Sequence, residues 1–296
     1  MAKTRPPSLT ETTQMLVDSA AKMSFDIDRD IDWDGVFDET LMHLPEHRIA
    51  LYGTELWDTL SREQKVEFSK YQTASMFTIG AWVETVFMQT LLREVYSADL
   101  TTSDAWHLYT EVGEECKHST MFGRIVARIG RSDYQPPWWA RQLGKLPGIW
   151  TPPLLALGVA LFFEEYFDAI QRESATDEAV HPLTRQINQI HVVEESRHLK
   201  FARAELNELL SASPLERLLL ALIYGPVIFV VLGFMVAPAA YEDAGLDPKA
   251  AAAVAKKNPY WRQTQRWASE QAMRTYARLG IRNIFGDTFC RLAGAL

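Results

Sequence analysis

Two stretches of the chain, eighty positions apart, repeat one combination of acidic and histidine residues. They are residues 111–118 (EVGEECKH) and residues 191–198 (HVVEESRH). An α-helix advances about 100° per residue, so His191, Glu195 and His198 would project from one narrow stripe of a helix. Carboxylate and imidazole groups that converge in this way are common metal ligands. The repeated pattern therefore indicates metal chemistry.

A further acidic residue precedes each stretch at a matched distance, inside an apolar helical pattern. Glu84 lies 31 residues before Glu115, and Glu164 lies 31 residues before Glu195. At about 1.5 Å per residue, two helices joined by a short turn bring the members of each pair level with each other. Two such hairpins packed face to face would gather the acids and histidines of four helices into one ring.

The helices needed for this arrangement can be recognised along the chain. Helical patterns of apolar residues occur at residues 10–23, 63–97, about 102–131, 154–174 and 182–210. The proline-rich residues 132–153 cannot form a continuous helix, so they are expected to connect two hairpins. We predict an all-α four-helix bundle with additional surrounding helices. The chain, 1–296, is expected to be a single domain with about nine disordered residues at its N-terminus.

Acids that converge in an apolar bundle require cations. Burying an unpaired carboxylate costs on the order of several kcal/mol. A single Glu-x-x-His motif is common on solvated helices, but two copies in register, each with a preceding acid, favour a dinuclear metal site. Oxygen and imidazole donors without thiolates suit iron or manganese better than a structural zinc ion.

These motifs resemble those of the ferritin-like di-iron carboxylate proteins, in which four acids and two histidines hold two metals. His191 adds a third histidine, and the surrounding sequence HVVEESRHLKFA is similar to arylamine N-oxygenases of the p-aminobenzoate N-oxygenase type. The resemblance covers about residues 60–210 and implies a ferritin-like bundle. It also implies the metal ligands Glu84, Glu115, His118, Glu164, His191, Glu195 and His198.

Other acids, histidines and one cysteine lie near these positions in the sequence. Matched spacing argues against Glu165 as a ligand and the helical angle argues against Glu194, while Glu111 has no ligand counterpart in the family that the chain resembles. All three are expected to lie around the ligands or to face solvent. Cys116 is expected to pack beside the site. No role is assigned to the remaining histidines, which are His43, His47, His107 and His181.

The resemblance implies an O₂-dependent di-iron monooxygenase that converts an arylamine to hydroxylamine, nitroso or nitro products. Its cofactor would be two iron ions, with manganese as an alternative, and O₂ its co-substrate. The sequence has no nucleotide-binding glycine motif, so electrons are expected from a separate reductase or small carrier. Arg266 and Arg274, within residues 264–279, are candidates for binding an anionic aromatic substrate or for forming surface salt bridges. No catalytic residue is predicted beyond the metal ligands.

Other functions would also use a bundle of this kind. Iron storage would need little more than the four helices, whereas this chain has roughly 140 further residues. A radical-generating subunit would need a redox tyrosine, such as Tyr109 or Tyr166, but would leave His191 unexplained. A different di-iron oxidase or hydroxylase, including a membrane-bound quinol oxidase, is a further alternative.

Composition narrows the partners and the compartment. A net charge of −8 without a basic block argues against nucleic acid as a partner. Two cysteines and an N-terminus without an apolar leader favour the cytoplasm.

One uncharged run, residues 218–240, is long enough to span a bilayer. Pro226 would interrupt a helix there, and no basic cluster flanks the run. We therefore predict a core helix or an oligomer contact, with a membrane contact as the alternative. The surplus of apolar surface favours a two-fold homodimer.

Overall fold

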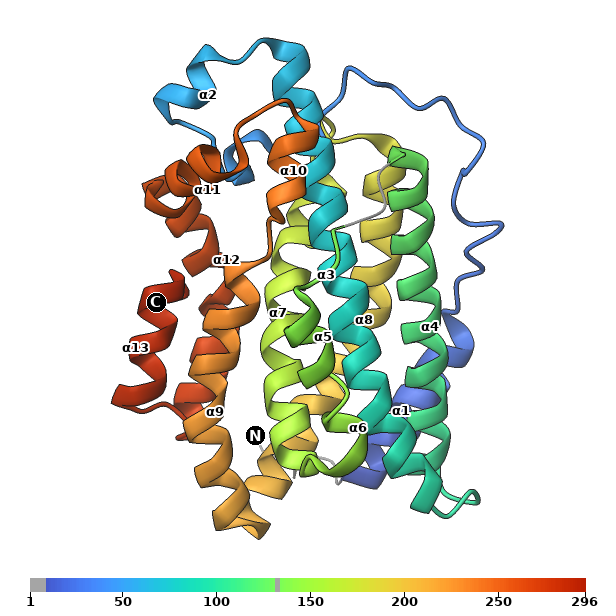
Figure 1. The fold of residues 1–296 in the computed structure, drawn as a ribbon. Helices are drawn as coiled ribbons and strands as arrows, with labels where there is room; N and C mark the ends of the chain where they lie inside the picture. Colours follow the sequence, from blue (N-terminus) through green and yellow to red (C-terminus); the bar gives the residue numbers. More distant parts are fainter. Residues whose placement is uncertain (1–8, 131–133) are drawn as a thin grey trace, which may run out of the picture.

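Helices make up 76% of the residues that the structure describes, 9–130 and 134–296, and no strand occurs among them. The structure is a computed structural model of the chain (Figure 1). Its α-helices are α1 (Leu9–Lys22), α2 (Glu55–Thr59), α3 (Arg62–Ser97), α4 (Ser103–Ile129), α5 (Trp138–Leu143), α6 (Pro147–Trp150), α7 (Pro153–Thr176), α8 (Pro182–Ala212), α9 (Pro214–Gly233), α10 (Pro238–Asp243), α11 (Pro248–Lys257), α12 (Pro259–Arg278) and α13 (Ile284–Ala293). A 3-10 helix, η1 (Glu46–Arg48), precedes α2. The predicted all-α fold class is confirmed.

The helices α3, α4, α7 and α8 run side by side through the molecule (Figure 1). The helix α3 packs against α4, α4 against α8, α8 against α7, and α7 against α3. These contacts close the predicted ferritin-like four-helix bundle, and each of its helices begins and ends within two residues of its predicted range.

Local sequence signals explain where the bundle helices begin. The side chain of Ser61 accepts a hydrogen bond from the backbone N–H of Gln64, and the Gln64 side chain accepts one from the Ser61 N–H, which together cap α3. Thr102 caps α4 in the predicted turn. Pro182 occupies the first position of α8, where no intrahelical donor is needed. Both hairpins are therefore set by capping residues at their turns.

The proline-rich connection between the hairpins contains only two short helices, α5 and α6, among its described residues. Arg93 of α3 fixes this segment, because its guanidinium donates hydrogen bonds to the carbonyls of Pro147 and Thr151. The connection thus lies along the bundle, close to α3 and α7 (Figure 1).

The apolar run 218–240 forms most of α9 and the start of α10, and α9 accommodates Pro226 in its interior. The helix α9 packs against α7 and α13. By length and composition, the segment Pro214–Asp243 is the one part of the described chain that could cross a membrane, although 39% of its most apolar window is buried. Leu222 and Phe229 point outward and are exposed. The helix is thus partly a core element, and the predicted homodimer remains a prediction.

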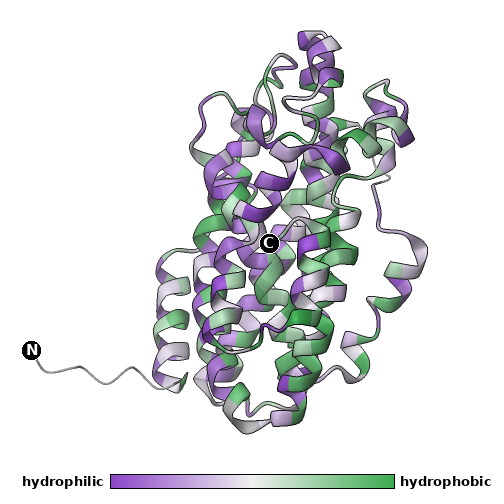
Figure 2. Ribbon diagram, turned by 90° about the vertical axis from the view of Figure 1, so that its left-hand side faces the viewer, coloured by the Kyte–Doolittle hydropathy of each residue, from purple (hydrophilic) through white to green (hydrophobic). Residues whose placement is uncertain are grey.

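The outer helices extend the hydrophobic core beyond the bundle. The cluster of buried apolar residues reaches from Ile31 to Ala295. Figure 2 shows hydrophobic residues along the helices of the lower part of the molecule, and more hydrophilic residues at its upper end. The helix α1 packs on α4 and α8, close to the predicted helix at residues 10–23. Disorder is predicted for about the first nine residues; residues 1–8 lie outside the described residues, and Leu9 begins α1.

Candidate metal centre

The residues predicted as metal ligands come from all four bundle helices and meet inside the bundle, where each is buried. Glu84 lies on α3 and Glu164 on α7, while the two motifs lie on α4 and α8. Their ligand atoms form three overlapping groups, and within each group all the atoms lie within 4.8 Å of one another. The groups are Glu115, His118, Glu195 and His198; Glu84, His118 and His191; and Glu164, His191 and Glu195.

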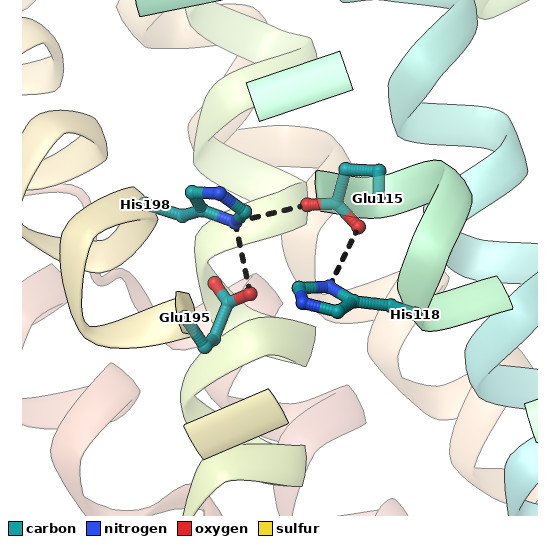
Figure 3. A group of neighbouring side chains, drawn as sticks. All are labelled: Glu115, His118, Glu195 and His198. Atoms are coloured by element: carbon teal, nitrogen blue, oxygen red, sulfur yellow. Dashed lines mark hydrogen bonds and ion pairs between the residues drawn. The ribbon is translucent and has the colours of Figure 1, made fainter. Parts of the chain in front are cut away.

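The first group lies at the middle of the centre, where α4 and α8 face each other (Figure 3). The Nδ1 atom of His198 is 3.0 Å from Oε2 of Glu195 and 3.1 Å from Oε1 of Glu115. The other oxygen of Glu115 is 3.6 Å from Nδ1 of His118. The carboxylate of Glu115 therefore lies between the two histidines, a position from which it could bridge two ions.

Many buried ligand atoms have no hydrogen-bond partner among the described residues. They are both oxygens of Glu115, Oε1 of Glu164, Oε1 of Glu195, and Nδ1 of His118 and His191. Leaving buried polar atoms unpaired costs about 1–3 kcal/mol each. Cations would use these lone pairs, and a set of four carboxylates and three imidazoles without a thiolate suits two iron or manganese ions. The donor set therefore fits a dinuclear metal site.

Burial and mutual repulsion control the protonation of the acids. Burial, together with the charge of Glu115, raises the pKa of Glu84 well above its ordinary value, and burial together with Glu195 raises that of Glu164 in the same way. Burial also acts to raise the pKa of Glu115, but the neighbouring imidazoles of His118 and His198 outweigh it and leave that pKa lowered. Without metal, the surroundings thus favour a proton on Glu84 and Glu164 and disfavour one on Glu115.

Two of the histidines, His118 and His198, have pKa values above that of an ordinary imidazole. Burial alone would lower the pKa of His118, but Glu115 and Glu194 raise it to about 10. Burial is likewise outweighed at His198, where Glu195 and neighbouring acids raise the pKa well above its ordinary value. Metal ions would have to displace these protons, so metal binding is coupled to proton release.

His191 differs from the other two histidines. Burial, together with the repulsion of His118, lowers its pKa well below the ordinary value and keeps the ring neutral. Its Nε2 lies 3.3 Å from Oε1 of Glu84, and its ring centroid lies 4.4 Å from that of His118. The packing of α8 against α4 thus brings His191 next to His118.

Each motif also supplies an acid that holds the histidine of the other motif. Oε2 of Glu194 on α8 is 3.0 Å from Nε2 of His118 on α4. Reciprocally, Oε2 of Glu114 on α4 is 2.9 Å from Nε2 of His198 on α8. These contacts leave Nδ1 of each histidine facing the ligand acids and fix the orientation of both rings.

A basic residue pairs with each of these outer acids. Lys117 forms an ion pair with Glu194, and Nη2 of Arg197 lies 2.5 Å from Oε1 of Glu114. The two basic residues are also eighty positions apart. The sequence analysis did not single out Glu114, Lys117 or Arg197, although the offset of the repeat could have revealed them. The eighty-residue repeat therefore also includes the acids that orient the two motif histidines and the basic residues that pair with these acids.

The acids adjacent to the ligands are buried and lie outside the metal-binding groups. Glu165 pairs with Arg203, whose Nη2 is 2.7 Å from its Oε1. Oε2 of Glu111 lies 3.3 Å from Nε2 of His107. The expectation that Cys116 packs beside the site is wrong, because its side chain is exposed. The step of about 100° from Glu115 turns this side chain away from the bundle interior.

The structure does not bring the two predicted substrate arginines to this centre. Both are exposed on α12. Arg274 pairs with Glu270 one helical turn away, and Arg266 donates to the carbonyl of Leu296. The surface role considered for them in the sequence analysis matches these contacts.

The tyrosines considered for a radical role lie in unlike surroundings. The hydroxyl of Tyr166 donates to Oε1 of Gln265 at 2.5 Å inside the core, and burial raises its pKa. Tyr109 is half exposed on α4.

The histidines without an assigned role make other contacts: His43 stacks on His181, His181 caps α8, His47 pairs with Glu173 and His107 contacts Phe201.

Comparison with known proteins identifies the family to which the chain belongs. Curated relatives include uncharacterized proteins of Mycobacterium bovis and of two Mycobacterium tuberculosis strains, each 26% identical over 215 residues. The match covers 67% of this chain and 60% of each relative, so the chain spans less than two thirds of their length. Residues 7–280 match the protein family described as "P-aminobenzoate N-oxygenase AurF". The chain therefore belongs to the p-aminobenzoate N-oxygenase AurF family.

Proposed function

We propose that this protein is an O₂-dependent di-iron oxygenase that transfers oxygen to the nitrogen of an aromatic amine. Family membership supports the oxygenase class. The single observation that carries the finer proposal is the position of His191, which takes part in two of the three candidate metal-binding groups. A third imidazole adds a nitrogen donor without adding negative charge, which distinguishes this centre from one with four acids and two histidines.

In this proposal the chain holds two ions with Glu84, Glu115, Glu164 and Glu195 as oxygen donors and the three histidines as nitrogen donors. When bound, iron would supply the redox chemistry that activates O₂.

The protein's own contribution is orientation and exclusion of water. Glu114 and Glu194 orient the two motif histidines. The ring of Phe122 stacks on Phe77 at 4.7 Å and lies 5.1 Å from the ring of His191. This apolar wall keeps His191 neutral and therefore able to donate a lone pair.

The proposal also includes an external electron donor, since a centre that reduces O₂ and oxidises an amine nitrogen needs electrons that the chain does not supply. A reductase or small carrier would deliver them. A cytoplasmic location and the absence of a nucleic-acid partner belong to the proposal as well.

The direct test is single-turnover chemistry on a panel of arylamines. Protein loaded with ferrous iron and kept anaerobic would be mixed with isotopically labelled O₂ and each amine, and the products would be read by mass spectrometry. We expect labelled oxygen on nitrogen, as hydroxylamine, nitroso or nitro product. Metal-free protein, prepared in parallel, should give none.

Two outcomes would contradict N-oxygenation. Labelled oxygen on ring carbon would point to the alternative, a different di-iron hydroxylase. Consumption of O₂ with every amine recovered unchanged would point to an oxidase or to a radical-generating protein.

A further inference from the structure

A large apolar cavity lies beside the metal centre, between α3, α5, α7 and α9. Its volume is ≈ 470 Å³, and Trp82, Phe87, Trp139, Phe163 and Val227 are among its lining residues. Cavities of about 300–1,000 Å³ are typical of small-molecule sites. The cavity is therefore large enough for an aromatic molecule of one or two rings.

Two residues that line the inner wall of this cavity directly precede acids of the centre in the sequence. Val83 lines it and precedes Glu84, and Phe163 lines it and precedes Glu164. Phe87 and Ala160, each within about one helical turn of those acids, also belong to the wall. The cavity is thus lined by apolar residues that neighbour the candidate metal ligands of α3 and α7 along these helices.

Three polar groups of the lining residues, the hydroxyl of Thr90 and the carbonyls of Gly144 and Pro147, already have hydrogen-bond partners. The hydroxyl of Thr90 donates to the carbonyl of Phe87 at 2.7 Å, and Nε2 of Gln89 donates to the carbonyl of Gly144 at 3.1 Å. Arg93 donates to the carbonyl of Pro147 at 3.2 Å. None of the described residues that line the cavity carries a charge. A ligand in this cavity would find apolar surface and few free hydrogen-bonding groups.

The outer wall is the inner face of α9, which contains the apolar run of the sequence. Ile223, Pro226, Val227 and Val230 line the cavity, whereas Leu222 on the same helix is exposed. One face of the apolar helix α9 therefore forms the outer wall of the cavity.

From these observations we infer that the cavity binds the substrate, and that the substrate is an uncharged, apolar arylamine without a carboxylate. A carboxylate held against the inner wall would lose hydration there and would find no cationic residue in the lining, and burying an unpaired carboxylate costs on the order of several kcal/mol. The arginines once considered as carboxylate ligands lie on the surface of α12 instead. This inference rests on the proposed function, because it names the substrate class of that activity.

The test compares two amines that carry either an ethyl ester or a carboxylate at the same ring position. Ethyl 4-aminobenzoate is neutral, and 4-aminobenzoate carries a carboxylate. Binding of each to the iron-loaded protein under anaerobic conditions would be measured by equilibrium dialysis. We expect the ester to bind at least about 100-fold more tightly than the acid. Equal binding, or tighter binding of the acid, would overturn the inference.

Variants locate the binding site. Val227→Trp on α9 and Leu155→Trp on α7 would each fill the cavity and should weaken binding of the ester about tenfold or more. Leu222→Trp adds the same ring to the exposed face of α9 and should leave binding unchanged. Helix content and metal content would identify a filling variant that fails to fold. Parent-like ester binding by a folded, metal-loaded filling variant would exclude this cavity as the site.

Binding and turnover separate the two proposals. An ester that binds in the cavity and is not oxidised on nitrogen would contradict the proposed function and retain the cavity as a site for neutral ligands. Oxidation of 4-aminobenzoate in preference to the ester would support the proposed function and contradict the inference.

Discussion

The two hairpins, α3–α4 and α7–α8, supply nearly the same groups to the centre. Each contributes an acid from its first helix and a Glu-x-x-His motif from its second. Each also sends an acid across to the histidine of the other hairpin, Glu114 to His198 and Glu194 to His118. The scaffold around the candidate metal centre is therefore close to two-fold symmetric.

The hairpins differ where the repeat is broken. His191 of α8 joins two metal-binding groups, whereas its counterpart Glu111 of α4 lies beside His107 and outside all three. Ser119 donates to Oε2 of Glu84 at 2.8 Å, but the equivalent position in α8 is Leu199, which has no hydroxyl to offer Glu164. A symmetric scaffold thus presents unequal environments to its two ends, and we expect the two ions to differ in reactivity.

The largest effect is expected when either acid of the central group, Glu115 or Glu195, is removed. Glu115→Ala and Glu195→Ala should each lower metal affinity by on the order of 100-fold or more and release both ions, because each acid lies in the central group. Elemental analysis after gel filtration measures the loss. The stabilisation of the parent by added metal, followed by thermal unfolding, should also disappear. A variant that keeps two tightly held ions would show that its acid is not shared.

The next largest effect is expected at His191, the position where the two motifs of the repeat differ. His191→Ala should keep most of the metal yet lose or redirect oxygen transfer, because the remaining acids and histidines still hold both ions while one loses its extra imidazole. Metal content, optical spectra and product masses would be compared with the parent. Unchanged spectra and turnover would remove His191 from the ligand set and, with it, the main reason to prefer N-oxygenation.

A smaller, paired effect tests the symmetry itself. Glu114→Gln and Glu194→Gln should each reduce metal affinity by about 10–100-fold, and to a similar extent, because each removes the carboxylate that orients one histidine. Competition with a chelator measures the affinity. Glu165→Gln is the matched control, since this acid is buried and paired with Arg203 but contacts neither histidine. A strong effect at only one of the two positions would break the proposed equivalence.

The smallest effect is expected at the counterpart of His191. Glu111→Gln should leave two ions bound and should stabilise the metal-free protein by roughly 1 kcal/mol, because neither carboxylate oxygen of Glu111 has a hydrogen-bond partner in the described structure. Chemical denaturation of the metal-free parent and variant measures the difference. Loss of an ion would instead make Glu111 a ligand.

The sequence predicts the bundle and the convergence of its acids and histidines because both depend on local regularities. Fixed rise and rotation per residue, with capping residues at Ser61 and Thr102, determine where each helix begins and which side chains are level. The outward turn of Cys116 follows from the same geometry and could have been predicted.

Other features depend on how the helices pack and could not be derived from spacing. The exchange of Glu114 and Glu194 between hairpins requires α4 and α8 to face each other at one level. The ring of His191 lies beside His118 for the same reason. The apolar cavity is lined by residues within 82–90, 139–163 and 223–231, three stretches that are distant in the sequence, so no single motif indicates it.

The most direct test of the account is the number of metal ions held by the folded chain. Protein reconstituted with ferrous iron under anaerobic conditions and freed of excess metal would be analysed for iron per chain, with Glu115→Ala as the control. The account predicts two ions per chain in the parent and none in the variant. One ion or none in a well-folded, fully loaded parent would contradict a dinuclear centre.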